Sequence, residues 1–550
     1  MAKPISLIKT FILVALVVNS VGMFLPSLSS TFTPYYGSIA KHIIQTNNWN
    51  DLIFSGHDWL DKPHLPFWLT ALSFKVFGVS TFSYVLPGFI FYIIGLFFTY
   101  KLGTYWFNSE TGIIAALLYS TSLHLLLSSI DVRAEAYLLG EIMPASYFWL
   151  KYNDNFNFKH LVTAAIFTAL AIMTKGIFVL ITIISGLATL WIYNKNWGNF
   201  ISLKWLLGLA LSITLIGPEL IALYQQFDLH PEKIVFDHTH VSGLKWFFWD
   251  SQFGRFFNTG PIMSTNPPPF HYLFFVHTFM WSFLPWSPIF LIALYQIIRN
   301  YKLLVPKDPY IYLLGSFFIT FILFSVTTFQ VDHYINILLP FACILSAQLL
   351  VRNLPYVKLY ITYTEITISV ILMLATILIS PILFNGFILI IIEILAILTL
   401  ILSYTLKSLD RALYTLIIPS MTILVIFILV SFTNGIEYAK YDAGYQIAKI
   451  LDQEKPNPIK GYQVDLLSLD FNANSSYQNI ESLGTMDDKT YYLVTTKENF
   501  LKLKPSLDNF KVVKSDVKGS DISTFISGKF NTETFNKNLK HYIVLEINPI

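Results

Sequence analysis

Long apolar runs with almost no charged residues recur from the N-terminus to about residue 433. The hydrocarbon core of a bilayer is about 30 Å thick and is crossed by roughly 20 residues of helix. Hydrophobic residues make up 54% of the 550 residues and charged residues only 13%, about half the usual charged fraction of a soluble protein. This composition excludes a soluble multidomain enzyme, a disordered protein and a coiled coil. We expect thirteen transmembrane helices, near residues 8–28, 82–102, 110–130, 134–151, 160–174, 176–194, 203–224, 273–297, 309–329, 334–351, 358–382, 386–405 and 411–433.

The distribution of basic residues predicts the orientation of these helices. Lys3 and Lys9 precede the first apolar run, but no convincing cleavage site follows it, so we interpret it as an uncleaved helix. With a cytoplasmic N-terminus, every inner connection contains Lys or Arg, whereas the short outer connections contain only Arg133 and Lys175. Thirteen helices then place the C-terminal end outside. The net charge of +3 is too small to indicate nucleic-acid binding, and we interpret the single Cys343 as a small buried hydrophobe.

This orientation leaves three segments on the outer, periplasmic face. Two are loops within the transmembrane domain of residues 1–433, at 29–81 and 225–272. The third is the polar segment 434–550, in which strand-like and helix-like stretches alternate. It is long enough for its own core, so we expect a soluble α/β domain. The strand-like stretches are 491–495 and 542–546, and the helix-like ones are 443–453 and 497–504.

Ionisable residues gather on the predicted outer face. Desolvating a charge is costly, so ionisable residues at or within a bilayer are candidates for function. Segments far apart in the sequence supply them, which indicates a cavity at the boundary between membrane and water. The residues are Asp58, Asp61, Lys62, Asp131, Arg133, Glu135, Lys175, Arg255, Asp332 and His333.

The run Asp61-Lys62-Pro63, followed by an apolar stretch, resembles the acidic-Lys-Pro pattern of bacterial aminoarabinose transferases that modify lipid A. These belong to the GT-C superfamily, which includes the protein O-mannosyltransferases. Further motifs follow in the order seen in that family and extend the resemblance over about residues 30–345. They are Tyr35-Tyr36-Gly37-Ser38-Ile39-Ala40, Ser129-Ile130-Asp131, Thr174-Lys175-Gly176, Phe253-Gly254-Arg255-Phe256, Phe283-Leu284-Pro285-Trp286-Ser287 and His333-Tyr334 with Leu339-Pro340.

One position departs from the family pattern. Members usually carry an acidic residue just before the first outer helix, whereas this chain has Thr31-Phe32-Thr33-Pro34. An acid there is a natural general base for an alcohol acceptor, which must lose its proton as it attacks. A phosphate monoester has a second pKa of about 6 and is already largely anionic near pH 7. The departure therefore favours a phosphate acceptor.

The resemblance implies catalytic roles for three residues. The donor is expected to be a polyprenyl-phosphate sugar, so the main task is to neutralise a departing phosphate. Lys62 is the first choice for this task, although a lysine here could also extend to the interface. Asp61 and Asp131 could orient the sugar, position Lys62 or hold a divalent cation together. Asp131 could instead cap a helix and pair with Arg133. Glu135, one helical turn later, could share the site of Asp131, but we expect it to pair with Arg133. A metal is left open, because two carboxylates alone are weak evidence for one.

The remaining candidates are substrate-binding residues. Lys175 and Arg255 are further cations for the phosphate. Alternatively, Lys175 only caps a turn between two helices, and Arg255 is a solvated loop residue. The aromatic residues could wall the pocket or could be ordinary interfacial residues, and His333 could contact a phosphate or simply be solvated. The aromatic candidates are Tyr35, Tyr36, Trp59 and Tyr334.

The resemblance implies a glycosyltransferase of the bacterial inner membrane. By this resemblance it would move a sugar, expected to be an amino sugar, from undecaprenyl phosphate to a lipid A phosphate with inversion at the anomeric carbon. Alternatives are a protein O-glycosyltransferase, an enzyme acting on another envelope glycan, and a secondary transporter or lipid flippase. Transporters usually show repeats and charges near the bilayer midplane, whereas here the charges lie at one face. The absence of a Walker or dinucleotide glycine motif fits a donor that is not a nucleotide.

Overall fold

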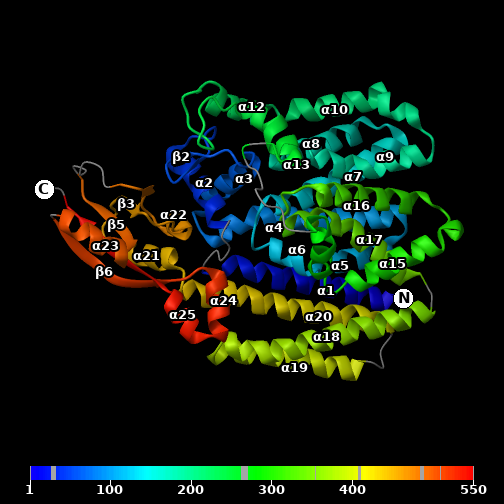
Figure 1. The fold of residues 1–550 in the computed structure, drawn as a ribbon. Helices are drawn as coiled ribbons and strands as arrows, with labels where there is room; N and C mark the ends of the chain where they lie inside the picture. Colours follow the sequence, from blue (N-terminus) through cyan, green and yellow to red (C-terminus); the bar gives the residue numbers. More distant parts are fainter. Residues whose placement is uncertain are drawn as a thin grey trace.

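The computed structural model describes residues 2–26, 33–259, 261, 270–352, 355–406, 411–482, 489–507 and 509–548. A bundle of mostly apolar helices forms the larger part, and a smaller sheet-containing domain packs at one end of it (Figure 1). The helices of the bundle are α1 (Ala2–Ser20), α4 (Thr81–Trp106), α5 (Ser109–Ser120), α6 (Leu123–Ser128), α7 (Ala134–Asn155), α8 (Phe158–Lys175), α9 (Val179–Tyr193), α10 (Leu203–Leu215), α11 (Gly217–Leu223), α14 (Phe274–Ser282), α15 (Ser287–Arg299), α16 (Asp308–Val326), η7 (Asp332–Leu338), α17 (Leu339–Val351), α18 (Pro355–Leu383), α19 (Gly386–Thr405) and α20 (Arg411–Phe432).

All thirteen predicted spans coincide with helix, but not every one is a straight membrane helix. Within the described residues, 8 helices are long and apolar enough to cross a membrane, or up to 10 if two bent pairs each count as one span. Three predicted spans fall outside this number: 110–130 is divided between α5 and α6, α7 carries several charges, and α9 has only 15 residues. The chain is therefore a multi-pass membrane protein, and the count of thirteen stays a prediction.

The predicted span 273–297 is bent rather than straight. Its two halves, α14 and α15, meet at an angle of 116°. Pro285 lies in the break and Pro288 in the first turn of α15. A proline cannot donate a helical hydrogen bond and clashes with the preceding turn, which explains why one apolar run forms two helices.

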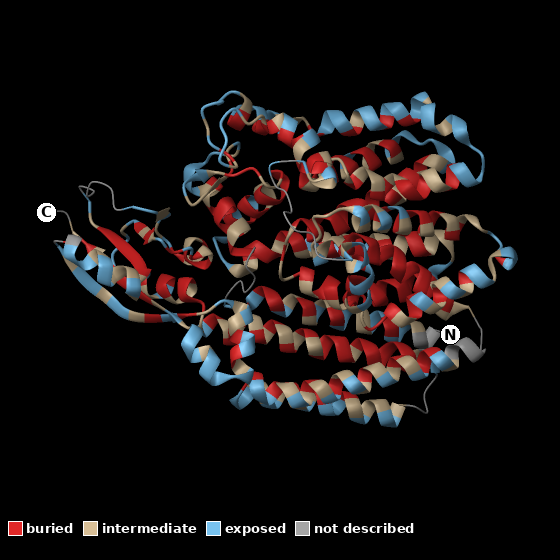
Figure 2. Cartoon of the chain, in the orientation of Figure 1, coloured by how far each residue is buried: buried red, intermediate tan, exposed pale blue. Residues whose placement is uncertain are grey.

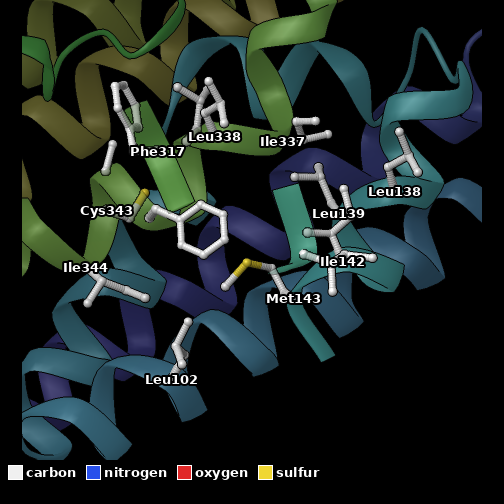
Figure 3. Packing of buried hydrophobic residues seen from close by; sticks show 14 of the residues in the cluster. Leu102, Leu138, Leu139, Ile142, Met143, Phe317, Ile337, Leu338, Cys343 and Ile344 are labelled. Carbon is white, nitrogen blue, oxygen red and sulfur yellow. The ribbon is translucent and has the colours of Figure 1, made fainter. Parts of the chain in front are cut away.

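The core of the bundle lies where α4, α5, α7, α16 and α17 meet (Figure 2). In Figure 3, Leu139 and Met143 of α7 face Phe317 of α16 and Cys343 of α17. Cys343 is fully buried, as predicted. Helix α7 approaches α4 so closely that a Cβ at Gly140 would overlap the backbone of Phe91. In contrast, only 17% of α19 is buried inside the chain, which is expected of a helix that faces lipid.

Both predicted outer loops contain short ordered elements. The first contains α2 (Thr33–Thr46), the hairpin strands β1 (Ile53–Phe54) and β2 (His57–Asp58), and α3 (Leu65–Phe77). The second contains η3 (Tyr224–Asp228), α12 (Gly243–Lys245), η4 (Trp246–Gly254) and α13 (Arg255–Phe257). Figure 1 shows the first set at the end of the bundle that faces the smaller domain.

The C-terminal part has the α/β character that its sequence predicts. A five-stranded sheet runs in the order β4-β3-β5-β7-β6, parallel from β4 to β5 and antiparallel from β5 to β6. The two predicted strands are the central neighbours β5 and β7, and the predicted helices are α21 and α23. The domain boundary at 433/434 stays a prediction. The elements are α21 (Ala443–Leu451), β3 (Ile459–Tyr462), α22 (Leu467–Asn472), β4 (Tyr477–Ile480), β5 (Tyr491–Thr496), α23 (Lys497–Leu503), β6 (Phe510–Gly519), α24 (Ile522–Phe530), α25 (Thr532–Asn538) and β7 (Lys540–Ile547).

Candidate active site

A cavity that is partly open to solvent lies where both outer loops meet the ends of α8, α9 and α16, and its empty space, counted together with the solvent at its mouth, is about 820 Å³. Its charged lining residues are Asp61, Lys62, Lys175 and Arg255, so three cations face one carboxylate. The rest of the lining is mainly aromatic and aliphatic, from residues such as Phe178, Val179, Leu323, Phe324 and Ile337. The arrangement suits an amphipathic ligand with an anionic head and an apolar tail.

Asp61 organises two of the cations. Its carboxylate accepts a hydrogen bond from the Lys62 ammonium, at 2.7 Å, and another from the Arg255 guanidinium. Burial alone would raise the pKa of Asp61, but Lys62 and Arg255 hold it well below its usual range, so it is ionised. The Arg255 guanidinium also lies over the ring of Phe329, 5.4 Å from the centroid. Asp61, predicted to be catalytic, and Arg255, predicted to bind substrate, are thus held together although they are 194 positions apart in the sequence.

Lys175 extends into the same cavity from the end of α8. Its ammonium pairs with Glu135 and lies 3.5 Å from the ring centroid of Tyr334. Glu135 was expected to pair with Arg133, and that prediction is wrong. Arg133 precedes α7 in an extended conformation and its guanidinium pairs with Asp131 at 2.8 Å, whereas Glu135 lies within the first turn of α7.

A second, smaller cavity of about 340 Å³ lies next to the first. Asp131, Glu135 and His333 contribute to its lining. The His333 ring lies within 3.0 Å of the Arg133 guanidinium and 3.6 Å from Glu135. Glu135 therefore links the two cavities, because it contacts Lys175 in one and His333 in the other. Asp131, predicted to share a chamber with Asp61, lines the second cavity rather than the first.

Three predicted wall residues lie outside these linings. Among the described residues that line the two cavities, the predicted aromatic candidate is Tyr334, in the first. His333, predicted as a possible phosphate contact, lines the second. Tyr35, Tyr36 and Trp59 instead pack in an aromatic cluster, in which the Trp59 indole N–H donates to the Tyr35 hydroxyl at 2.5 Å. A direct role for them in the pocket wall stays a prediction.

Tyr36 is nevertheless influenced by charged residues that line both cavities. Burial and the negative charge of Asp61 raise the pKa of Tyr36, and Arg133 and Arg255 oppose this shift.

The position that departs from the family pattern is partly described. Thr31 and Phe32 lie outside the described residues. The Thr33 hydroxyl donates a hydrogen bond of 2.6 Å to Asp131. This contact ties the start of α2 to the second cavity.

Other contributors were not identified from the sequence. Phe329, Trp246 and Gln252 all line the first cavity, yet aromatic and amide residues are too common in this chain to stand out. The Gln252 amide donates to the backbone carbonyl of Lys175 at 3.2 Å and accepts from the backbone N–H of Phe178 at 3.3 Å. Among the described residues, no group of three or more His, Cys, Asp or Glu side chains is arranged to hold a metal ion.

Comparisons with known proteins agree with this architecture. Residues 61–221 match the family of dolichyl-phosphate-mannose-protein mannosyltransferases. The fold superposes on crystal structures of ArnT from Cupriavidus metallidurans in the apo state (TM-score 0.76) and bound to undecaprenyl phosphate (TM-score 0.74), each at 16% identity and over 99% of both chains. An uncharacterized protein of Aquifex aeolicus (strain VF5) is 22% identical over 379 residues, 66% of this chain and 70% of that protein.

The chain is a multi-pass membrane protein with the GT-C type of fold. It shares the fold of ArnT over 99% of both chains, including the C-terminal sheet domain. The resemblance stated from the sequence motifs is thereby confirmed.

Proposed function

We propose that the protein transfers an amino sugar from a polyprenyl phosphate to a phosphate group of lipid A. The reaction would take place at the periplasmic face of a bacterial inner membrane. The observation that carries the proposal is the cluster of Lys62, Arg255 and Lys175 at the head of an apolar cavity. A phosphate joined to an isoprenoid chain matches both parts of this lining, and a protein of the same fold was crystallised with undecaprenyl phosphate.

The proposed reaction is a single displacement at the anomeric carbon. An oxygen of the acceptor forms a bond to this carbon as the bond to the donor phosphate oxygen breaks, which inverts the configuration. The electron pair stays on the departing polyprenyl phosphate, where Lys62, Arg255 and Lys175 stabilise the developing charge. Asp61 keeps the first two cations in place. The carboxylates of Asp131 and Glu135 would orient amino and hydroxyl groups of the sugar from the second cavity.

The acceptor follows from the chemistry of the first outer helix. The residue at its start is Thr33, which donates a hydrogen bond to Asp131 and has no carboxylate with which to deprotonate an alcohol. A lipid A phosphate is already largely anionic near pH 7, so it would attack without such a base. The second candidate is a protein O-glycosyltransferase. It is supported by the match of residues 61–221 to the protein mannosyltransferase family.

The test is mass spectrometry of lipid A from cells with and without the gene, together with transfer assays in detergent. We expect a lipid A species with an added sugar that disappears with Lys62→Ala and persists with Lys245→Ala. Lys245 is a matched control, because it belongs to the second outer loop but its side chain is 68% exposed. Unchanged lipid A, with glycosylated protein in its place, would support the alternative. Transfer without a membrane gradient would exclude a transporter.

A further inference from the structure

A glutamate within the bundle is hydrogen-bonded to the loop that carries Lys62. Glu219 lies in the first turn of α11 and is fully buried. One carboxylate oxygen accepts from the backbone N–H of His64, and the other lies 2.9 Å from Nδ1 of the same residue. A buried carboxylate is costly unless it is well bonded, and here both oxygens are directed at one residue, two positions after Lys62.

His64 is held on both sides. Its Nε2 lies 2.9 Å from the backbone carbonyl oxygen of Asn50, and its ring is fully buried. Both ring nitrogens therefore face acceptors, so each contact requires a proton. His64 and Glu219 together must hold one proton between them in addition to the Nε2–H. The pair is neutral as a unit, which makes its burial tolerable.

The same helix holds the rest of the loop two turns later. Gln226, also fully buried, accepts from the backbone N–H of Leu52 and donates to its carbonyl, each at 3.0 Å. Its amide also donates to Asp58 at 3.0 Å. The segment from Leu52 to His64 is thus held at both ends by the continuous helix Gly217–Asp228, which leads into the second outer loop.

We propose that Glu219 is a positioning residue, which through His64 sets the place of Lys62 in the cavity. Pro63 separates the two residues and restricts the backbone between them, so a shift of His64 is transmitted to Lys62. The inference rests on the proposed function only in assigning a polyprenyl phosphate to Lys62. A displacement of about 1 Å from a site can cost about 100-fold in rate, so the loss of such a contact is measurable.

The experiment compares Glu219→Ala and Glu219→Gln with the wild-type protein. In Glu219→Gln, the amide oxygen can accept from the His64 backbone N–H while the amide N–H donates to Nδ1 of a neutral imidazole. If Lys62 loses its hydrogen bond to the phosphate, we expect undecaprenyl phosphate to bind about 10- to 100-fold more weakly to Glu219→Ala and nearly normally to Glu219→Gln. Adding Glu219→Ala to Lys62→Ala should have little further effect, because the two residues act through one contact.

Hydrogen exchange of segment 50–64 gives a second readout that needs no ligand. It should quicken in Glu219→Ala and stay unchanged in the matched control Glu365→Ala, which removes another fully buried glutamate from α18. Normal binding by Glu219→Ala, or additive losses in the double variant, would overturn the proposal. If the wild-type protein itself fails to bind undecaprenyl phosphate, the proposed function fails, and unchanged exchange in Glu219→Ala would then overturn the positioning role separately.

Discussion

At the scale of single residues, Lys62 is subject to opposing electrostatic effects. Burial lowers the pKa of its ammonium, and the neighbouring carboxylate of Asp61 offsets only part of this decrease in pKa. Because the folded-state pKa lies below the ordinary lysine value of about 10.4, the charge is present at low pH and is lost as pH rises through that lowered value. Binding of the phosphate that the proposed function assigns to Lys62 should weaken over the same range.

We therefore expect the affinity for undecaprenyl phosphate to fall as pH rises through a range that lies below that of a free lysine. In Lys62→Arg the fall should be smaller, since a guanidinium stays protonated at these pH values. The measurement is the dissociation constant at each pH in detergent. Identical pH profiles for the two proteins would show that Lys62 does not carry the titrating charge.

At the scale of elements, the α8–α9 turn positions Lys175. Gly176 has φ +93° and ψ −175°, and a Cβ there would overlap the Gln252 amide that holds the turn. Such backbone angles are essentially restricted to glycine and cost about 1–3 kcal/mol otherwise. Gly176→Ala should lower stability by about that amount and weaken undecaprenyl phosphate binding, measured by thermal unfolding and titration. Gly198→Ala is the control, because open space surrounds Gly198; equal effects would contradict the interpretation.

The elements were more predictable than their geometry. Apolar runs identify the membrane helices, and the strand-like runs 491–495 and 542–546 identify two strands, because solvent preference and side-chain type are local properties of the sequence. The 116° bend between α14 and α15 was not predicted, since the apolar run continues through Pro285. The partner of Glu135 was also missed: the choice between Arg133 and Lys175 depends on which helix end approaches α7, and no local pattern records that.

At the scale of the whole molecule, the site is assembled from segments that are remote in sequence. Asp61 and Arg255 are 194 positions apart and Arg133 and His333 are 200 apart. The sequence identified these residues, because charges are rare in an apolar chain, but it could not show that they form two adjoining cavities rather than one. The buried pair of Glu219 and His64 had no assigned role for the same reason: its meaning lies in a contact across 155 positions.

Helix α2 joins the site to the C-terminal domain. Thr33, at the start of α2, donates a hydrogen bond to Asp131. Lys41, about one turn before the end of α2, is only 5% exposed. The Lys41 ammonium donates to the backbone carbonyl oxygens of Asp470 at 2.6 Å and Phe471 at 3.4 Å, and also to that of Ala473. A buried cation thus satisfies the carbonyl end of α22, where helix carbonyls otherwise lack partners.

Lys41→Met should therefore loosen the C-terminal domain from the bundle. The carbonyl groups that lose their donor would cost about 1–3 kcal/mol if they stayed buried, so separation of the two surfaces becomes easier. We expect faster proteolysis of the connection near residue 440 and, because α2 also holds Asp131, slower sugar transfer. Lys440→Met is the control, since the Lys440 side chain is 56% exposed and pairs only with nearby Glu437 among the described contacts. If Lys41→Met resists proteolysis as well as the control does, the domain is held by its apolar contacts alone.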